Sequence, residues 1–320
     1  MNKTKTALKH FDMLAARQAY AQGMNITELL RQQKQLSYNS PEIIEAAYDL
    51  QAGTYIDYVE NNLTQAHAYA GELASLLSQH LKPLDSLLDI GTGELTTLSL
   101  IARQLPFPPE QLYAFDISWS RVHKGMAFAQ QHMGKTFERL TPFIADISEI
   151  PLLDKSVNVT VSSHALEPNG ETLSELLEEL FRVTIDKLML FEPCYEINSE
   201  QGRQRMDRLG YIKNIAGVAE QLGATVVEQI PIKTSPNPLN PTVCFVITPP
   251  DVATRPAPSG RRPTEVFSVP GSNLPLENLE GFYCSQDTGL CFPVLKSLPI
   301  LKSSAAILAS ALTCSRPVPR

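Results

Sequence analysis

Acidic residues stand at the ends of three successive apolar runs in the middle of the sequence. Asp89 precedes the turn Gly91-Thr92-Gly93 after the first run, Asp116 follows the second, and Asp146, with Ile147 next to it, follows the third. Two glycines let the backbone approach a ligand closely, and a carboxylate can accept hydrogen bonds from both hydroxyls of a ribose. One such acid alone is more often a helix cap, but three in succession indicate a nucleoside site.

The glycine turn does not complete the pattern of a nicotinamide dinucleotide site. That pattern, GxGxxG, requires glycine at position 96, where the sequence has Thr96. Asp89, two residues before the first glycine, is a feature that a nicotinamide site does not demand. An NAD-dependent oxidoreductase therefore stays as the weaker alternative. A measurement of nicotinamide cofactor binding would decide whether it is correct.

Candidate catalytic residues follow the fourth and fifth apolar runs. His164 has an unperturbed pKa of about 6.5, which suits proton removal near neutrality. A histidine packed at a strand end with a satisfied hydrogen bond explains the residue equally well. Glu192 follows a strongly apolar run and is expected to project into the ligand crevice and contact the substrate, whereas Glu167, in a Glu-Pro-Asn-Gly turn, could simply cap a helix.

A series of short apolar runs, alternating with helical stretches, must position these residues. The runs are Leu87–Ile90, Leu112–Phe115, Leu140–Ile144, Val157–Ser162, Ile185–Phe191, Thr225–Ile230 and Val243–Ile247. The helical stretches are Leu95–Gln104, Ser118–His132, Leu173–Val183 and Gln201–Leu222. This order predicts an α/β fold, a doubly wound, mostly parallel seven-stranded sheet with helices on both faces, whose ligands lie beyond the carboxyl ends of the strands.

The N-terminal section, residues 1–82, is predicted to be a helical cap. Asn25 with Glu28 resembles a capping box, Ser40-Pro41 is typical of a helix start, and helical spacing of apolar residues runs on from Leu63. Residues 83–248 are assigned to the ligand-binding domain. Of 24 prolines, 15 fall in the last 90 residues, which indicates a proline-rich linker over 249–263 and a small α+β tail over 264–320.

Composition limits the class of protein and of partner. The chain has 320 residues, 43% hydrophobic and 19% charged, as in ordinary globular proteins, and its net charge of −7 is unfavourable for nucleic-acid binding. No apolar segment behind the first residues resembles a signal peptide, and none is long enough to span a membrane. The five cysteines are an odd number without framework spacing. We therefore expect a cytoplasmic protein without a disulfide scaffold.

Three segments resemble the class I S-adenosylmethionine-dependent methyltransferases, in particular the branch related to the ubiquinone and menaquinone biosynthesis enzymes. They are LLDIGTGEL at 87–95, YAFDIS at 113–118 and ADISEIPLLDKSVNVTVSSHALE at 145–167, of which the last is the most specific. Upstream, YDLQAGTYIDY at 48–58 is similar to the aromatic segment that folds over the cofactor in this family. Glu94 departs from the family, because many members have a third glycine or another small residue there.

The resemblance implies a Rossmann-like methyltransferase fold, S-adenosylmethionine as cofactor, and a set of cofactor-binding residues. Gly91 and Gly93 would face the methionine part, whose amino group Asp89 would help to place. Asp116 with Ile117 would contact the ribose, and Asp146 with Ile147 would contact the adenine. Ser163 or His164 would lie beside the sulfonium, and Tyr48 and Tyr55 would form the aromatic cover. No metal is implied.

The tail segment YCSQDTGLCFPVLKSLPILKSSAAIL at 283–308 resembles the second half of a small zinc-ribbon family that includes activator subunits of methyltransferases. That family holds zinc with two Cys-x-x-Cys pairs. Here Asp287 stands where the second cysteine of the pair that begins at Cys284 would be, and residues 266–276 contain no cysteine. The resemblance therefore implies a degenerate, metal-free ribbon that serves as a docking or lid domain and is a candidate surface for homo-oligomer contacts.

The sequence as a whole favours a methyltransferase acting on oxygen or nitrogen of a small-molecule or glycan-type acceptor, with neither nucleic acid nor membrane as partner. The segment Ser162-Ser163-His164-Ala165 lacks the Asn/Asp-Pro-Pro-aromatic signature of related enzymes that methylate exocyclic amines of bases and glutamine. A methyltransferase-like scaffold without turnover is the second alternative. Release of S-adenosylhomocysteine with candidate acceptors would separate it from an enzyme.

Overall fold

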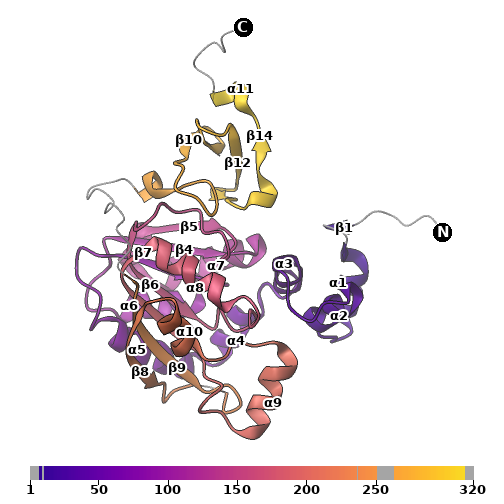
Figure 1. Cartoon of the computed structure of the whole chain (residues 1–320), viewed down its shortest axis with the longest axis vertical. Helices are drawn as coiled ribbons and strands as arrows, with labels where there is room; N and C mark the ends of the chain where they lie inside the picture. Colours follow the sequence, from indigo (N-terminus) through magenta and orange to yellow (C-terminus); the bar gives the residue numbers. More distant parts are fainter. Residues whose placement is uncertain (1–6, 9–10, 236, 251–262, 314–320) are drawn as a thin grey trace, which may run out of the picture.

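The computed structural model describes residues 7–8, 11–235, 237–250 and 263–313, and its centre is a seven-stranded sheet (Figure 1). The strand order is β5-β4-β3-β6-β7-β9-β8, and only β9 runs antiparallel to its neighbours. The strands are β3 (Ser86–Ile90), β4 (Gln111–Asp116), β5 (Leu140–Ile144), β6 (Val157–Ser163), β7 (Thr184–Pro193), β8 (Thr225–Pro231) and β9 (Thr242–Thr248). The predicted fold class and all seven predicted runs are confirmed.

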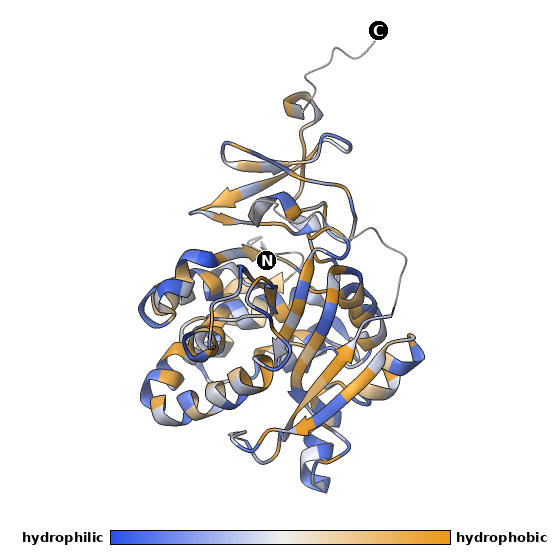
Figure 2. Ribbon diagram, turned by 90° about the vertical axis from the view of Figure 1, so that its left-hand side faces the viewer, coloured by the Kyte–Doolittle hydropathy of each residue, from blue (hydrophilic) through white to orange (hydrophobic). Residues whose placement is uncertain are grey.

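Helices cover both faces of this sheet. One face packs against α8 (Leu173–Val183) and α10 (Ile215–Gln221), and the other packs against α5 (Leu63–Leu77), α6 (Thr96–Gln104) and α7 (Trp119–His132). Because alternate residues of a strand point to opposite faces, Leu88 and Ile90 enter the first core and Leu87 enters the second. Burial on both faces explains the long apolar runs of the central strands, which Figure 2 shows as orange stretches interrupted by blue at polar residues.

The N-terminal helices form a separate small core beside the sheet. They are α1 (Met13–Ala21), α2 (Ile26–Lys34) and α3 (Pro41–Leu50), preceded by the short strands β1 (Ala7–Leu8) and β2 (Phe11–Asp12). The next helix, α4 (Thr54–Asn61), instead packs Val59 into the core of the large sheet. The Asn25 carboxamide accepts a hydrogen bond from the Glu28 N–H at 3.1 Å, as the predicted cap requires. Pro41 occupies the first turn of α3, although the Ser40 side chain makes no capping bond.

The predicted helix over Gln201–Leu222 is wrong, because the chain makes two helices there. The first, α9 (Glu200–Leu209), ends at Gly210, whose φ of 69° lies in the left-handed region. Asn214, with a φ of 55°, then precedes α10. A glycine past a helix end terminates the helix by satisfying its last carbonyls, and apolar spacing on both sides hid that break.

The C-terminal tail is a small antiparallel sheet that lies against the β5 edge of the large sheet (Figure 1). Its strands are β10 (Glu277–Leu279), β11 (Phe282–Cys284), β12 (Leu290–Leu295), β13 (Leu298–Pro299) and β14 (Ile307–Leu308), and a short helix α11 (Ser310–Thr313) follows. Phe267 and Tyr283 of the tail continue the core that contains Phe143 of β5. Residues 251–262 of the predicted linker lie outside the described residues.

Cys284 and Cys291 form one disulfide bond between β11 and β12, a pairing that the expectation of a protein without a disulfide scaffold did not include. The two residues face each other directly in the antiparallel register, with Cα atoms 4.1 Å apart. The hairpin sets this proximity, and cysteine counting alone could not reveal it. Among the described residues, no helix is long and apolar enough to cross a membrane.

Candidate active site

A cavity opens beyond the carboxyl ends of β3, β4, β5 and β6, and it gathers nearly all the residues expected to bind ligand. The expected residues that line it are Tyr48, Tyr55, Asp89, Gly91, Gly93, Asp116, Ile117, Asp146, Ile147, Ser163 and His164. Glu192 is the exception. These residues are spread over more than a hundred positions of the sequence. The parallel sheet brings them together because all four strand ends lie at one edge of the sheet.

The glycine turn after β3 forms the floor of the cavity. Gly91 and Gly93 both have a φ of 58°, in the left-handed region that favours glycine. A Cβ at Gly91 would lie 2.5 Å from the Cβ of Ala165, so a side chain there would also collide with the segment after β6. The turn can therefore approach both its neighbours and a ligand only as glycine.

Asp116, at the end of β4, organises this turn before any ligand is considered. One carboxylate oxygen accepts the Gly93 N–H at 2.9 Å, and the other accepts the Ser118 N–H, also at 2.9 Å. Each oxygen retains a lone pair for a further donor. Asp116 can therefore hold the glycine turn and accept ligand hydroxyls at the same time.

Glu94 ties the aromatic segment over residues 48–58 to the glycine turn. Its two carboxylate oxygens accept the N–H groups of Gly53 and Ile56, each at 2.9 Å, at the start of α4. A carboxylate at a helix N-terminus satisfies free backbone donors and interacts favourably with the helix dipole. The residue that departs from the family pattern thus has a definite structural role.

Arg121, on the first turn of α7, is the cation of the cavity wall. Its guanidinium carbon lies 5.1 Å from the ring centre of Tyr48 and 4.9 Å from that of Tyr55. Its nitrogens lie 3.7 Å from an Asp116 oxygen and 3.9 Å from a Glu94 oxygen. The two tyrosines therefore contact a buried cation whose charge is balanced by two acids.

Asp89 and Asp146 differ in their surroundings. Burial, reinforced by the charge of Asp116, raises the pKa of Asp89 to about 7. Asp146 already accepts the N–H and the hydroxyl of Ser148, at 2.9 and 2.8 Å. Asp89 is therefore a desolvated carboxyl, whereas Asp146 is held in place by its own turn.

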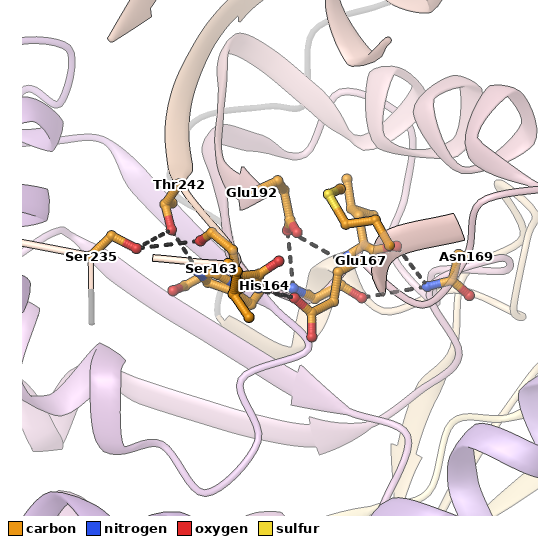
Figure 3. Close-up of polar contacts among 12 residues, drawn as sticks. Ser163, His164, Glu167, Asn169, Glu192, Ser235 and Thr242 are labelled. Carbon is orange, nitrogen blue, oxygen red and sulfur yellow. Dashed lines mark hydrogen bonds and ion pairs between the residues drawn. The ribbon is translucent and has the colours of Figure 1, made fainter. Parts of the chain in front are cut away.

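His164 is held by hydrogen bonds at both ring nitrogens (Figure 3). Its Nδ1 lies 3.0 Å from a Glu167 carboxylate oxygen, and its Nε2 lies 3.0 Å from the Thr242 hydroxyl. The same hydroxyl lies 3.1 Å from the Ser235 hydroxyl. Asn240 donates to Glu167 at 3.1 Å. The network joins the segment after β6 to β9 and the loop before it.

The ion pair sets the charge state of His164. Burial opposes the charge on the imidazole, but the hydrogen bond and charge of Glu167 outweigh it and raise the pKa of His164 above its ordinary value. Burial likewise opposes the charge on Glu167, yet the hydrogen bond from His164 lowers the pKa of that carboxyl. The pair is therefore stabilised in its charged form.

Glu192 does not project into the cavity, which corrects the expectation for this residue. Its side chain is completely buried, and one oxygen accepts the N–H groups of Ala165 and Leu166 at 3.0 and 3.1 Å (Figure 3). Burial raises its pKa to about 7. The turn after β6 folds over the end of β7 and covers the carboxyl, so Glu192 supports the His164 turn from behind.

Several residues of the site carried no interpretable signal in the sequence. Glu94 was noted only as a departure from the family pattern, and Arg121 could have been noticed as a cation in the first turn of the helix that follows Asp116. Tyr69 hydrogen-bonds with Ser163, Asn240 with Glu167, and Thr242 with His164. These contacts join distant segments, so the spacing of residues in the sequence does not predict them.

Comparison with known proteins agrees with this geometry. Residues 88–187, which span β3 to the first part of β7, match the family model described as a methyltransferase domain. Over these residues the chain is similar to a methyltransferase domain. The expected enzyme class and its cofactor, S-adenosylmethionine, are thereby confirmed, and the nicotinamide alternative falls. The ubiquinone-related branch and the zinc-ribbon character of the tail stay predictions.

Solved structures with a similar fold share little sequence with this chain. A methyltransferase from Aquifex aeolicus has 17% identity, with 55% of this chain and 88% of that chain covered and a TM-score of 0.42. Geranyl diphosphate C-methyltransferase from Streptomyces coelicolor has 11% identity, coverages of 55% and 75%, and a TM-score of 0.43. A complex of the Haloferax volcanii Trm112 methyltransferase activator with a methyltransferase has 17% identity, coverages of 63% and 97%, and a TM-score of 0.48. Comparison with curated proteins finds no significant match.

Proposed function

We propose that the cavity binds S-adenosylmethionine and that His164 orients or deprotonates an acceptor whose oxygen or nitrogen receives the methyl group. The observation that carries this proposal is the position of His164 on the wall of the cavity that the glycine turn and Asp116 also line. The acceptor we propose is a small molecule or a sugar-containing metabolite.

The residues present fit the cofactor. The Gly91–Gly93 turn lines the part of the cavity suited to the amino acid moiety, Asp116 retains lone pairs for the ribose hydroxyls, and Asp146 with the Ile147 backbone suits the adenine edge. Ser163 and His164 then line the side facing β6. When bound, S-adenosylmethionine supplies an activated methyl group on its sulfonium.

The protein must hold the acceptor in line, exclude water and remove a proton where the acceptor is a hydroxyl or an ammonium. His164 can take that proton at Nε2 only in its neutral form, which is populated above its raised pKa, and once Nε2 no longer bonds to the Thr242 hydroxyl. Glu167 holds Nδ1 and stabilises the imidazolium that then forms. We assign Glu192 a positioning role, since it fixes the backbone that follows His164. An acceptor that is already ionised would need positioning alone.

The test measures S-adenosylhomocysteine release with a panel of hydroxyl and amine metabolites, using His164→Gln and His164→Ala variants. A positioned base contributes roughly 10²- to 10⁴-fold, so turnover should fall by that factor while the Kd for S-adenosylmethionine stays nearly the same. His80→Gln, whose ring pairs with Glu228 away from the cavity, is the matched control.

Normal turnover by the His164 variants, with an unchanged pH profile, would return His164 to a structural role. Absence of turnover by the unmodified protein on every acceptor class, despite cofactor binding, would favour the scaffold alternative. We propose that the tail acts as a docking or lid element and as a surface for homo-oligomer contacts, which size measurement of the whole protein and of a Leu308→Asp variant, at an exposed tail position, would test.

A further inference from the structure

Arg121 supplies the one lysine or arginine side chain among the described residues that line the cavity. The side chain is buried, with 8% of its surface exposed, and its Nε atom has no hydrogen-bond partner. A buried donor without a partner lowers stability, so each such group calls for a structural or functional explanation.

The two acids beside Arg121 balance its charge but do not use up its donors. Both oxygens of Glu94 accept backbone N–H groups at the start of α4, and both oxygens of Asp116 accept the N–H groups of Gly93 and Ser118. The distances from the guanidinium to these acids, 3.7 and 3.9 Å, exceed hydrogen-bonding range. The guanidinium is therefore left with hydrogen-bonding capacity toward a further anion.

The fold holds this guanidinium against the glycine turn. A Cβ at Gly93 would lie 2.5 Å from an Arg121 terminal nitrogen, so the arginine occupies the space that a side chain at position 93 would take. The rings of Tyr48 and Tyr55 contact it from the aromatic segment, and Glu94 fixes that segment in turn. These contacts reduce the conformational freedom that an arginine ordinarily loses on binding a ligand.

We propose that Arg121 binds the carboxylate of the amino acid part of S-adenosylmethionine. This inference rests on the proposed binding of the cofactor in the cavity. The glycine turn is the part of the cavity suited to the amino acid moiety, and the nearby acids, Asp89, Glu94 and Asp116, would repel a carboxylate unless a cation stood between them. A guanidinium matches a carboxylate with two parallel hydrogen bonds.

The test compares two ligands that differ in this group, S-adenosylmethionine and decarboxylated S-adenosylmethionine, by calorimetry. Charge-assisted hydrogen bonds of this kind correspond to roughly 10- to 100-fold in affinity. Arg121→Gln should weaken binding of S-adenosylmethionine by that factor and change binding of the decarboxylated ligand by less than about threefold. Arg121→Lys should restore part of the loss, because it keeps the charge without the fork. Arg103→Gln, the same change on an exposed position of α6, is the control.

Equal weakening of both ligands by Arg121→Gln would overturn the inference, since it would mean that the arginine only stabilises Asp116 and the glycine turn. Unchanged affinity for S-adenosylmethionine in Arg121→Lys and Arg121→Gln would overturn it as well. Failure of the unmodified protein to bind either ligand would instead overturn the proposed function itself, so the two failures can be told apart.

Discussion

The two halves of the cavity are built in different ways. The half formed by the glycine turn, Asp116 and Asp146 depends on backbone geometry and strand ends within one continuous stretch of the sheet. The half around His164 depends on side chains that meet from separate segments, β6, β9 and the loop before β9. The backbone half suits a cofactor that is bound in the same way whatever the acceptor. The side-chain half suits recognition of a particular acceptor, because its side chains can be replaced without a change in the sheet.

The largest expected effect tests the backbone half. Gly91→Ala places a Cβ 2.5 Å from that of Ala165 on a residue with positive φ, where strain alone costs about 1–2 kcal/mol. We expect the Kd for S-adenosylmethionine to rise at least about 30-fold. Gly23→Ala, also at positive φ but with no atom near the added Cβ, should lower the thermal midpoint and leave the Kd unchanged. Equal Kd values for the two variants would show that the turn is not part of the site.

Asp116→Ala addresses the same half through a side chain. The variant removes two bonds to the backbone as well as the acceptor for ligand hydroxyls, so S-adenosylmethionine affinity should fall at least about tenfold. Calorimetry, with circular dichroism to check the fold, measures this. Tight binding by a folded Asp116→Ala protein would remove the residue from the cofactor site.

Glu167→Gln tests the side-chain half. The loss of the negative charge beside His164 should lower the pKa of the imidazole, so the acidic limb of the turnover profile should move to lower pH. We expect a decrease in turnover of about three- to thirtyfold with little change in cofactor affinity. Glu175→Gln, on the exposed surface of α8, is the control. An unshifted acidic limb would mean that the pair does not control the reaction.

The smallest effect on ligand binding is expected for Glu192, the buried carboxyl behind the turn after β6, whose replacement should change the pH dependence of stability. The folded pKa of Glu192, about 7, lies above its ordinary value of 4.5, so the folded protein binds more protons between these pH values. Stability from this group is complete below about pH 4.5 and is lost as the pH rises to about 7, by up to about 3 kcal/mol. In Glu192→Gln the pH slope of the urea unfolding free energy should decrease by this contribution, and the part due to Asp89, whose folded pKa is also about 7, should remain. Retention of the full slope would assign it to other groups.

The sequence was a good guide to the backbone half and a poor one to the rest. Strand ends could be predicted because apolar runs buried on both faces are continuous, so Asp89, Asp116 and Asp146 could be placed on one edge. The position of Glu192 could not be predicted, because the turn that covers it depends on how the segment after β6 folds back. The break between α9 and α10 was missed for a related reason, since a glycine cap outweighs apolar spacing at Gly210.

The contact between the tail and β5 affects how this protein behaves in concentrated solution. Ile300 forms a parallel bridge with Ile144, the Leu301 N–H donates to the Ile144 carbonyl at 2.8 Å, and Leu298 packs on Ile144 and Val122. An uncovered outer strand offers backbone groups to other chains and promotes aggregation. The tail occupies that edge of the sheet with its own chain, while at the opposite edge β8 alternates exposed and half-buried residues and carries Glu228. A chain that ended before residue 298 would therefore expose the β5 edge and be more prone to aggregation.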